Sequence, residues 1–236
     1  MSRMVAVEIW AVSRLSENDA DDMEFLYRSY YEGAGEGVFR KDLEDKDWVV
    51  LLRQSVDSSE RSRVVGFSTM KFMSVAGEDV LFSGDTVVDE ACRVQSGLAG
   101  AFGHVMKYLS ETGKKNVYWF LICKGARTYR FLPTFFHRYV PGENIDIELS
   151  AKLKTIASAL YPDEYDEKSG ILHFGPGKDR LKTDVLRRDM QSVRFRLMNP
   201  GWSKGDELCC LAPLSMDNLN RLGHRVIADV APKWYL

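Results

Sequence analysis

Residues 80–88 read Val-Leu-Phe-Ser-Gly-Asp-Thr-Val-Val, and residues 117–122 read Val-Tyr-Trp-Phe-Leu-Ile. Both are short, mainly apolar runs, as expected of strands inside a folded domain. Between them, Ser96–Thr112 carries apolar residues at helical spacing, namely Leu98, Ala101, Phe102, Val105 and Leu109. This part of the chain therefore predicts a β-α-β unit.

The flanking sequence adds further elements on both sides of this unit. Strands are predicted at Val5–Val12, Trp48–Leu52, Val64–Phe72, Ser192–Met198 and Glu207–Leu211. Helices are predicted at Ser16–Tyr31, Val38–Asp45, Pro133–Tyr139 and Ile147–Leu160. A run of hairpin-connected strands that leads into one β-α-β unit predicts an α+β (mixed α/β) fold rather than a doubly wound sheet.

The length of 236 residues fits a single domain over residues 1–236. Residues 1–140 form the predicted core. Residues 141–190 are polar and rich in glycine and proline, so we expect an insertion or lid there. Residues 191–236 are predicted to hold two closing strands and a C-terminal tail.

The composition limits the classes of function. A net charge of −2 gives no sign of the basic surface that binds nucleic acid. No apolar run approaches the roughly 20 residues that span a bilayer, and the first ten residues do not resemble a signal peptide. The four cysteines lack metal-type spacing. We expect a cytoplasmic protein with reduced thiols, no metal site and no membrane partner.

Two polar segments interrupt or follow the apolar strands. Ser83–Thr86 places polar residues and a glycine in a strand that should be central, which is costly unless these groups are hydrogen-bonded or used. Three cations, Lys124, Arg127 and Arg130, follow the most apolar strand. They could meet a phosphate or a carboxylate-bearing acceptor, or form a solvated loop.

Three stretches carry a resemblance to a known family. They are Arg63–Ser68, where an apolar pair precedes a glycine and an aromatic residue, Thr86–Asp89 at a strand end, and Arg93–Ala99 at the start of the helix. With the order of elements, they resemble the GCN5-related N-acyltransferase (GNAT) superfamily. The sequence is also similar to a group of bacterial GNAT-like proteins, through stretches such as Lys46–Val49 and Tyr118–Ile122.

This resemblance implies a GNAT-like splayed mixed sheet of about seven strands flanked by helices, with an insertion before the last two strands. It also implies that acyl-CoA or acetyl-CoA, or an acyl-phosphopantetheine on a carrier protein, is the acyl donor. The family signature for the pyrophosphate is altered here, because Ser96 or Val94 departs from it in either alignment.

The donor-binding residues implied by the resemblance are Arg93, Gln95, Ser96, Gly97, Leu98 and Ala99. Backbone N–H groups at a helix start attract phosphate, and small residues allow its close approach. The alternative is an ordinary strand-to-helix turn with Ser96 as the N-cap.

The resemblance also implies catalytic roles. Asp85 is the candidate general base, and backbone N–H groups near Val87 and Val88 would polarise the thioester carbonyl. Tyr129 or Tyr139 would be the general acid for the leaving thiolate. The structural alternatives are that Asp85 bonds to a neighbouring loop or bulge, and that the tyrosines pack with satisfied hydroxyls.

The sequence therefore predicts an N-acyltransferase that acts on an amine of a small molecule or of a protein. The alternative is a catalytically inactive GNAT-like module that binds a ligand or a protein. Pairing into a homodimer through the last strands is a further prediction.

Overall fold

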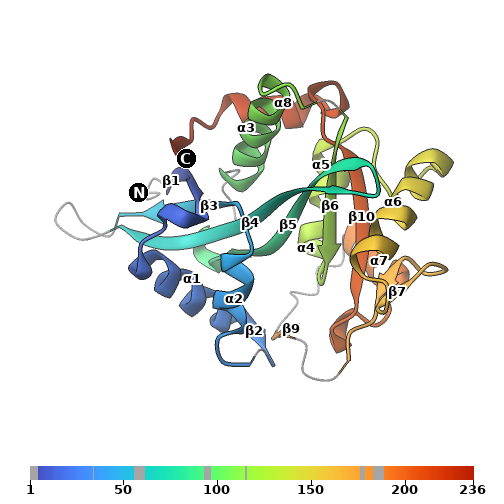
Figure 1. Ribbon diagram of the computed structural model, residues 1–236, viewed down its shortest axis with the longest axis horizontal. Helices are drawn as coiled ribbons and strands as arrows, with labels where there is room; N and C mark the ends of the chain where they lie inside the picture. Colours follow the sequence, from blue (N-terminus) through green and yellow to red (C-terminus); the bar gives the residue numbers. More distant parts are fainter. Residues whose placement is uncertain are drawn as a thin grey trace.

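The computed structural model of the protein describes residues 5–33, 35–55, 62–92, 97–114, 116–175, 179–182 and 189–236. Within these ranges, nine strands form one sheet in the spatial order β11-β1-β3-β4-β5-β6-β10-β8-β7 (Figure 1). Their bounds are β1 (Val5–Ala11), β3 (Trp48–Gln54), β4 (Arg63–Val75), β5 (Glu78–Val88), β6 (Val117–Cys123), β7 (Tyr165–Asp166), β8 (Ile171–Leu172), β10 (Glu207–Pro213) and β11 (Lys233–Tyr235). A separate strand pair joins β2 (Tyr31–Glu32) to β9 (Arg180–Leu181).

Helices cover both faces of the sheet (Figure 1). They are α1 (Glu17–Tyr30), α2 (Val38–Glu44), α3 (Gly97–Glu111), α4 (Ala126–Tyr129), α5 (Phe131–Phe135), α6 (Ile147–Leu160), α7 (Met190–Met198) and α8 (Arg221–Ala228). Successive residues of a strand point to opposite faces. Leu81 and Trp119 therefore pack in the core under α3 and α8, whereas Phe82 and Phe120 pack with α6.

On the sheet face that carries α6, a second group of helices packs separately from α6. There α1 and α2 pack on β3, β4 and the end of β5, around Phe67 and Val87. The buried residues under α1 and α2 and those under α6 belong to two different hydrophobic clusters. As a result, the region between α1–α2 and α6 is left for a pocket.

The α+β (mixed α/β) fold is confirmed. Strands β3, β4 and β5 are antiparallel, and β5 pairs with β6 in parallel through α3, as the β-α-β pattern predicts. The β4–β5 hairpin turns at Ala76 and Gly77, whose φ angles of 51° and 83° suit the two-residue turns that match strand twist.

One predicted strand is wrong. Ser192–Met198 lies in the helix α7, and only Glu207–Pro213 forms a closing strand. The segment alternates apolar and polar residues, which imitates a strand, but Asp189 caps a helix by accepting a hydrogen bond from the Ser192 N–H. Only Phe195 among its apolar residues is buried, while Met190 and Leu197 are exposed.

Other differences concern short elements. The helix predicted at Pro133–Tyr139 is α5, which ends at Phe135. Within the described ranges the sheet has nine strands rather than about seven, because β7, β8 and β11 were not predicted and the strand predicted at Ser192–Met198 is absent. The insertion contributes α6, which packs under the sheet, and β8, which pairs with β10. No helix in the described part of the chain has the length and apolar character needed to cross a membrane.

Candidate functional site

The sheet opens where β5 and β6 part. Their parallel pairing runs from Asp79 opposite Val117 to Ser83 opposite Leu121, and it stops there although β5 continues to Val88. Beyond that point β5 pairs with β4 alone. The opening leads into a cavity of about 770 Å³, which is lined by residues of β5, β6 and helices on both faces. The pocket therefore passes through the sheet.

A β-bulge shapes the β5 wall of this pocket. Ser68 pairs with Thr86 and Met70 with Ser83, so Thr69 of β4 stands opposite two residues of β5, Gly84 and Asp85. A bulge bends a strand and redirects its side chains. Here it coincides with the point at which β5 leaves β6, and both bulge residues line the pocket.

The other polar residues of this stretch have structural partners. Ser83 accepts a 2.7 Å hydrogen bond from Trp119 Nε1, and the hydroxyls of Thr86 and Ser68 lie 2.7 Å apart. A Cβ at Gly84 would lie 2.6 Å from Thr69 Oγ1 and 2.9 Å from Lys46 Cε, so only glycine fits there. Asp85 differs, because no hydrogen bond joins its carboxyl group to the described residues.

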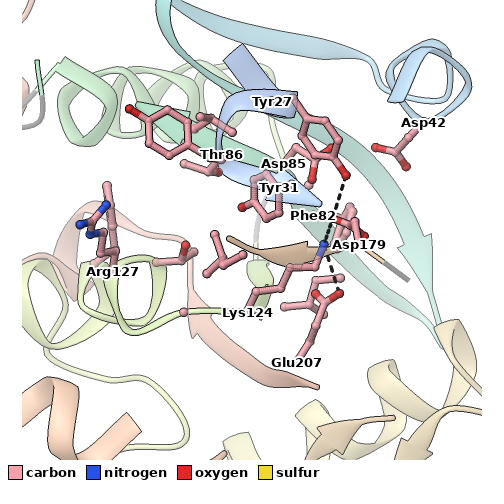
Figure 2. A pocket seen from close by; sticks show the side chains of 18 of the residues that line it. Tyr27, Tyr31, Asp42, Phe82, Asp85, Thr86, Lys124, Arg127, Asp179 and Glu207 are labelled. Carbon is pink, nitrogen blue, oxygen red and sulfur yellow. Dashed lines mark hydrogen bonds and ion pairs between the residues drawn. The ribbon is translucent and has the colours of Figure 1, made fainter. Parts of the chain in front are cut away.

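A charged cluster lies across the pocket from the bulge, and Figure 2 shows its members converging on Lys124. The ammonium of Lys124 lies 2.5 Å from Asp179 Oδ2 and 3.6 Å from Glu207 Oε1. Asp179 also accepts a 2.7 Å hydrogen bond from the Tyr27 hydroxyl. The same ammonium stands 5.1 Å from the centre of the Tyr31 ring, within cation–π range. The cluster joins α1, β6, β10 and the insertion.

Burial and this cluster set the protonation of Asp85. Its burial within the pocket raises the pKa of its carboxyl group to about 6. Lys124 opposes the increase, while Asp42, Asp179 and Glu207 add to it. Burial also disfavours the charge of Lys124, but the surrounding carboxylates outweigh it and raise the pKa of Lys124, so this residue stays an ammonium. Asp85 is therefore a carboxylate poised to accept a proton near neutral pH.

The opposite end of the pocket is cationic and lies at the start of α3. Leu98 and Ala99 line it, with Arg127 and Arg130 from the segment after β6. Arg130 also contacts Asp189 at 3.2 Å. Helix starts and arginines both favour bound phosphate. In the described lining, this end has two arginines, whereas the bulge and the end beyond it have five carboxyl groups and three lysines, namely Asp42, Asp45, Asp85, Asp179, Glu207, Lys46, Lys71 and Lys124.

The structure brings several of the predicted donor-binding residues together. Leu98, Ala99, Val87 and Val88 all line the pocket. Gly97 faces the other way, because a Cβ there would lie 2.9 Å from Leu52 Cδ2, so this glycine lets α3 pack closely on the sheet. The predictions for Arg93, Gln95 and Ser96 fall outside the described residues.

The two predicted tyrosines lie outside the lining of this pocket. Tyr129 is fully buried, and its hydroxyl donates a 3.0 Å hydrogen bond to the Pro141 carbonyl. Tyr139 packs against the main hydrophobic core. The tyrosines that do line the pocket are Tyr27, Tyr30, Tyr31 and Tyr161.

Sequence reasoning missed the residues that come from distant segments. Asp179 lies in the insertion, and Glu207 begins a strand that was expected only to close the sheet. A buried carboxylate at a strand start is unusual, and Glu207 is only 1 % exposed, so its place beside the apolar run Leu208–Leu211 was a usable signal. Asp179 had no such signal.

Neither a metal nor a reactive thiol is indicated in the described ranges. No group of three or more His, Cys, Asp or Glu side chains there could hold a metal ion. All four cysteines are buried. Burial raises the pKa of Cys210, whose Sγ lies 3.9 Å from Cys123 Sγ, so its thiol stays protonated.

Comparison with known proteins gives matches among solved structures. No family model and no curated protein matches the chain. The GNAT family N-acetyltransferase YhbS of Escherichia coli, in complex with CoA, is 18 % identical over 57 % of this chain and 70 % of its own, with a TM-score of 0.41. NAA60 of Arabidopsis thaliana, in complex with a bisubstrate analogue, is 16 % identical over 62 % of this chain and 92 % of its own, with a TM-score of 0.41. An acetyltransferase of Trypanosoma brucei is 16 % identical over 61 % of this chain and all of its own, with a TM-score of 0.37.

Proposed function

We propose that the protein transfers an acyl group from an acyl thioester, acyl-CoA, to an amine. The observation that carries this proposal is the pocket that passes through the sheet where β5 leaves β6, with the Asp85 carboxyl group at the bulge between its two ends. A donor and an acceptor can enter from opposite faces and meet at β5. Such positioning of two reactants supplies a large part of catalysis in bimolecular reactions.

The cationic end supports the donor part of the proposal. Arg127 and the start of α3 at Leu98 and Ala99 would hold the phosphates, and the pantetheine arm would lie between β5 and β6. An acyl carrier protein is the alternative donor, since it presents the same arm. Ala99 lines the pocket, which supports a working site over a catalytically inactive module.

The strand ladder supports a way to polarise the thioester. The Asp89 N–H bonds to the Val65 carbonyl of β4, and amides of an antiparallel pair alternate in direction. The Val87 N–H then points to β4, whereas the Thr86 N–H points toward β6 and the opening. An amide so placed would stabilise the oxyanion that forms when the amine attacks.

Asp85 would complete the reaction as general base. Its carboxylate accepts a proton from the attacking nitrogen, a C–N bond forms, and the C–S bond breaks to release the thiolate, which takes up a proton from water. The carboxylates around Lys124 keep its ammonium charged near Asp85, and Asp85 remains the proton acceptor.

Donor binding tests this proposal directly. CoA at millimolar concentration should raise the melting temperature, because a ligand at 100 times its dissociation constant adds about 2.7 kcal/mol to the free energy of unfolding. Thermal melts with CoA, and with the dephosphorylated pantetheine as the control, measure this. If CoA leaves the melting temperature unchanged and no thiol is released from acetyl-CoA with any amine, CoA is not the donor.

A further inference from the structure

The pocket extends in two directions on the sheet face that carries α6. Ser83 and Leu121 form the last pair between β5 and β6, and Phe82 and Phe120 form the pair before it. Lys124 follows Phe120 on the chain by four residues, which is about 13 Å of extended chain. The ionic cluster around Lys124 therefore lies toward the C-terminal ends of these strands, and Phe82 lies in the opposite direction.

The part of the pocket toward Phe82 has apolar walls, and we call it the apolar chamber. In the described lining, its walls are one residue each from β4, β5 and β6 and two from the end of α6, namely Met73, Phe82, Ile122, Leu160 and Tyr161. All of them pack with the hydrophobic cluster under α6. Met73, Ile122 and Leu160 are only half-buried, so they leave apolar surface that a ligand could cover.

Two lysines border the apolar chamber, and each is paired with a carboxylate. Lys46 donates hydrogen bonds of 2.9 Å to the Asp42 carbonyl and 2.7 Å to the Asp42 carboxylate, and Lys71 lies 2.5 Å from Asp45 Oδ1. The Cε of Lys46 would lie 2.9 Å from a Cβ at Gly84. Lys46 therefore covers the strand with its methylene stem while its charge bonds to Asp42, as long cationic side chains commonly do.

The proposed donor site leads into the apolar chamber. The donor phosphates would lie at the start of α3, on the other face of the sheet, and the sulfur would lie in the opening next to Asp85. The acyl group on this sulfur would then emerge on the face that carries α6. Ile122 borders the opening there, because it directly follows the last β5–β6 pair. An apolar chain gains free energy by leaving water for such walls.

The length of the apolar chamber indicates the length of the chain. Asp85 and Phe82 are three residues apart on β5, which corresponds to about 10 Å of strand. Three extended residues contain about nine backbone bonds, so a hydrocarbon chain of about eight carbons covers the same distance. An acetyl group would leave the side chains of Phe82 and Leu160 without a partner.

We propose that the transferred acyl group is a straight apolar chain of about eight carbons, and that Phe82, Ile122 and Leu160 select it. This inference rests on the proposed function. The chain stays on the carbonyl carbon during transfer, while the C–N bond to the amine forms and the C–S bond breaks. Asp85 keeps the proton of the nitrogen, and the thiolate takes up a proton from water.

A series of acyl-CoA compounds tests the chain length on the unmodified protein. Each methylene that moves from water to an apolar site strengthens binding about fourfold. Titration calorimetry without an acceptor should show that octanoyl-CoA binds at least tenfold more tightly than acetyl-CoA, and that dodecanoyl-CoA binds no more tightly than octanoyl-CoA. An octanoyl advantage below tenfold would overturn the proposal. So would an affinity that still rises to dodecanoyl-CoA, because non-specific apolar binding has no length limit.

A matched pair of variants on α6 tests the location of the chain. Leu160→Trp places a larger side chain at the apolar chamber, and Ile147→Trp adds the same side chain at the other end of the helix, where Ile147 is 80 % exposed. We expect Leu160→Trp to lower the ratio of octanoyl-CoA to acetyl-CoA affinity at least tenfold, and Ile147→Trp to leave this ratio unchanged. Equal ratios in the two variants would refute the location. If Leu160→Trp does not fold by its melting curve, the acyl-CoA series on the unmodified protein decides.

The same measurements separate this inference from the proposed function. CoA binding and thiol release without any gain from the octanoyl chain would support acyl transfer and contradict the apolar chamber as the acyl site. A tenfold octanoyl gain without thiol release to any amine would support the acyl site and contradict acyl transfer to an amine. If no acyl-CoA binds, the series is repeated with acyl-pantetheines, which carry the arm that a carrier protein presents. The same tenfold gain would then support the acyl site and contradict CoA as the donor, and no gain would refute the acyl site.

Discussion

Asp85→Asn is expected to lower kcat/KM for acyl transfer by a factor of about 10² to 10⁴, the usual contribution of a general base. Asparagine fits the space at the bulge but cannot accept the proton of the attacking amine. The affinity for CoA should stay unchanged, since the donor phosphates would lie at the other end of the pocket. Steady-state rates of thiol release and calorimetric titration with CoA measure the two effects.

The control for this variant lies on the same strand. Asp79→Asn makes the identical change at the far end of β5, where Asp79 accepts a 2.8 Å hydrogen bond from Ser74 and does not line the pocket. It should leave the rate within about twofold of the unmodified protein, because surface changes away from such a site have small effects. If Asp85→Asn keeps more than a tenth of the activity, Asp85 is not the base.

The raised pKa of Asp85 gives this variant two further signatures. The rate for the unmodified protein should rise with pH through about 6, as the carboxyl group ionises, and Asp85→Asn should lack this rise. In the unfolded chain the same group titrates lower, so the folded state binds more protons between the two pKa values. Asp85 therefore destabilises the fold as pH rises through 6. Asp85→Asn should consequently melt at a higher temperature than the unmodified protein at pH 7.5, although its acyl-transfer rate is lower.

Ala99→Phe is expected to lower the affinity for CoA by a factor of about 100, which corresponds to roughly 2.7 kcal/mol. Ala99 lies in the first turn of α3 and lines the cationic end of the pocket. An aromatic ring there would occupy the space proposed for the pantetheine arm and the phosphates. Titration calorimetry with CoA measures the loss, and circular dichroism checks that the helix content is unchanged.

Ser110→Phe is the matched control, because it adds the same ring to an exposed position of the same helix. It should bind CoA as the unmodified protein does. If Ala99→Phe binds CoA with full affinity, the donor does not occupy the start of α3, and the cationic end of the pocket has another role.

The fold was predictable from the sequence where periodicity and burial agree. The β-α-β unit has an apolar strand on each side and a helix with one apolar face, and each of these patterns reflects the surface that the element buries. Ser192–Met198 was predicted as a strand from the same kind of pattern, and that prediction was wrong. Its alternation imitates a half-buried strand, yet the apolar residues Val193 and Leu197 are exposed on a helix. Alternation of apolar and polar residues therefore does not by itself show which residues are buried.

The candidate site was predictable only in part. Asp85 was found because a charged residue in a central strand needs a reason, and its neighbours Ser83 and Thr86 proved to have structural hydrogen bonds. Asp179 was not found, since it lies 94 positions further along the chain, in a polar segment without periodicity. Only the folding of the insertion onto β2 brings it to Lys124. Contacts of this kind depend on tertiary structure, which local patterns do not record.

The structure of the protein with CoA bound is the most direct test of the central claim, that the opening between β5 and β6 holds the donor. We predict the phosphates beside Leu98 and Ala99 and the sulfur between β5 and β6, next to the bulge at Asp85. CoA bound elsewhere on the molecule, with this opening unchanged, would contradict the claim.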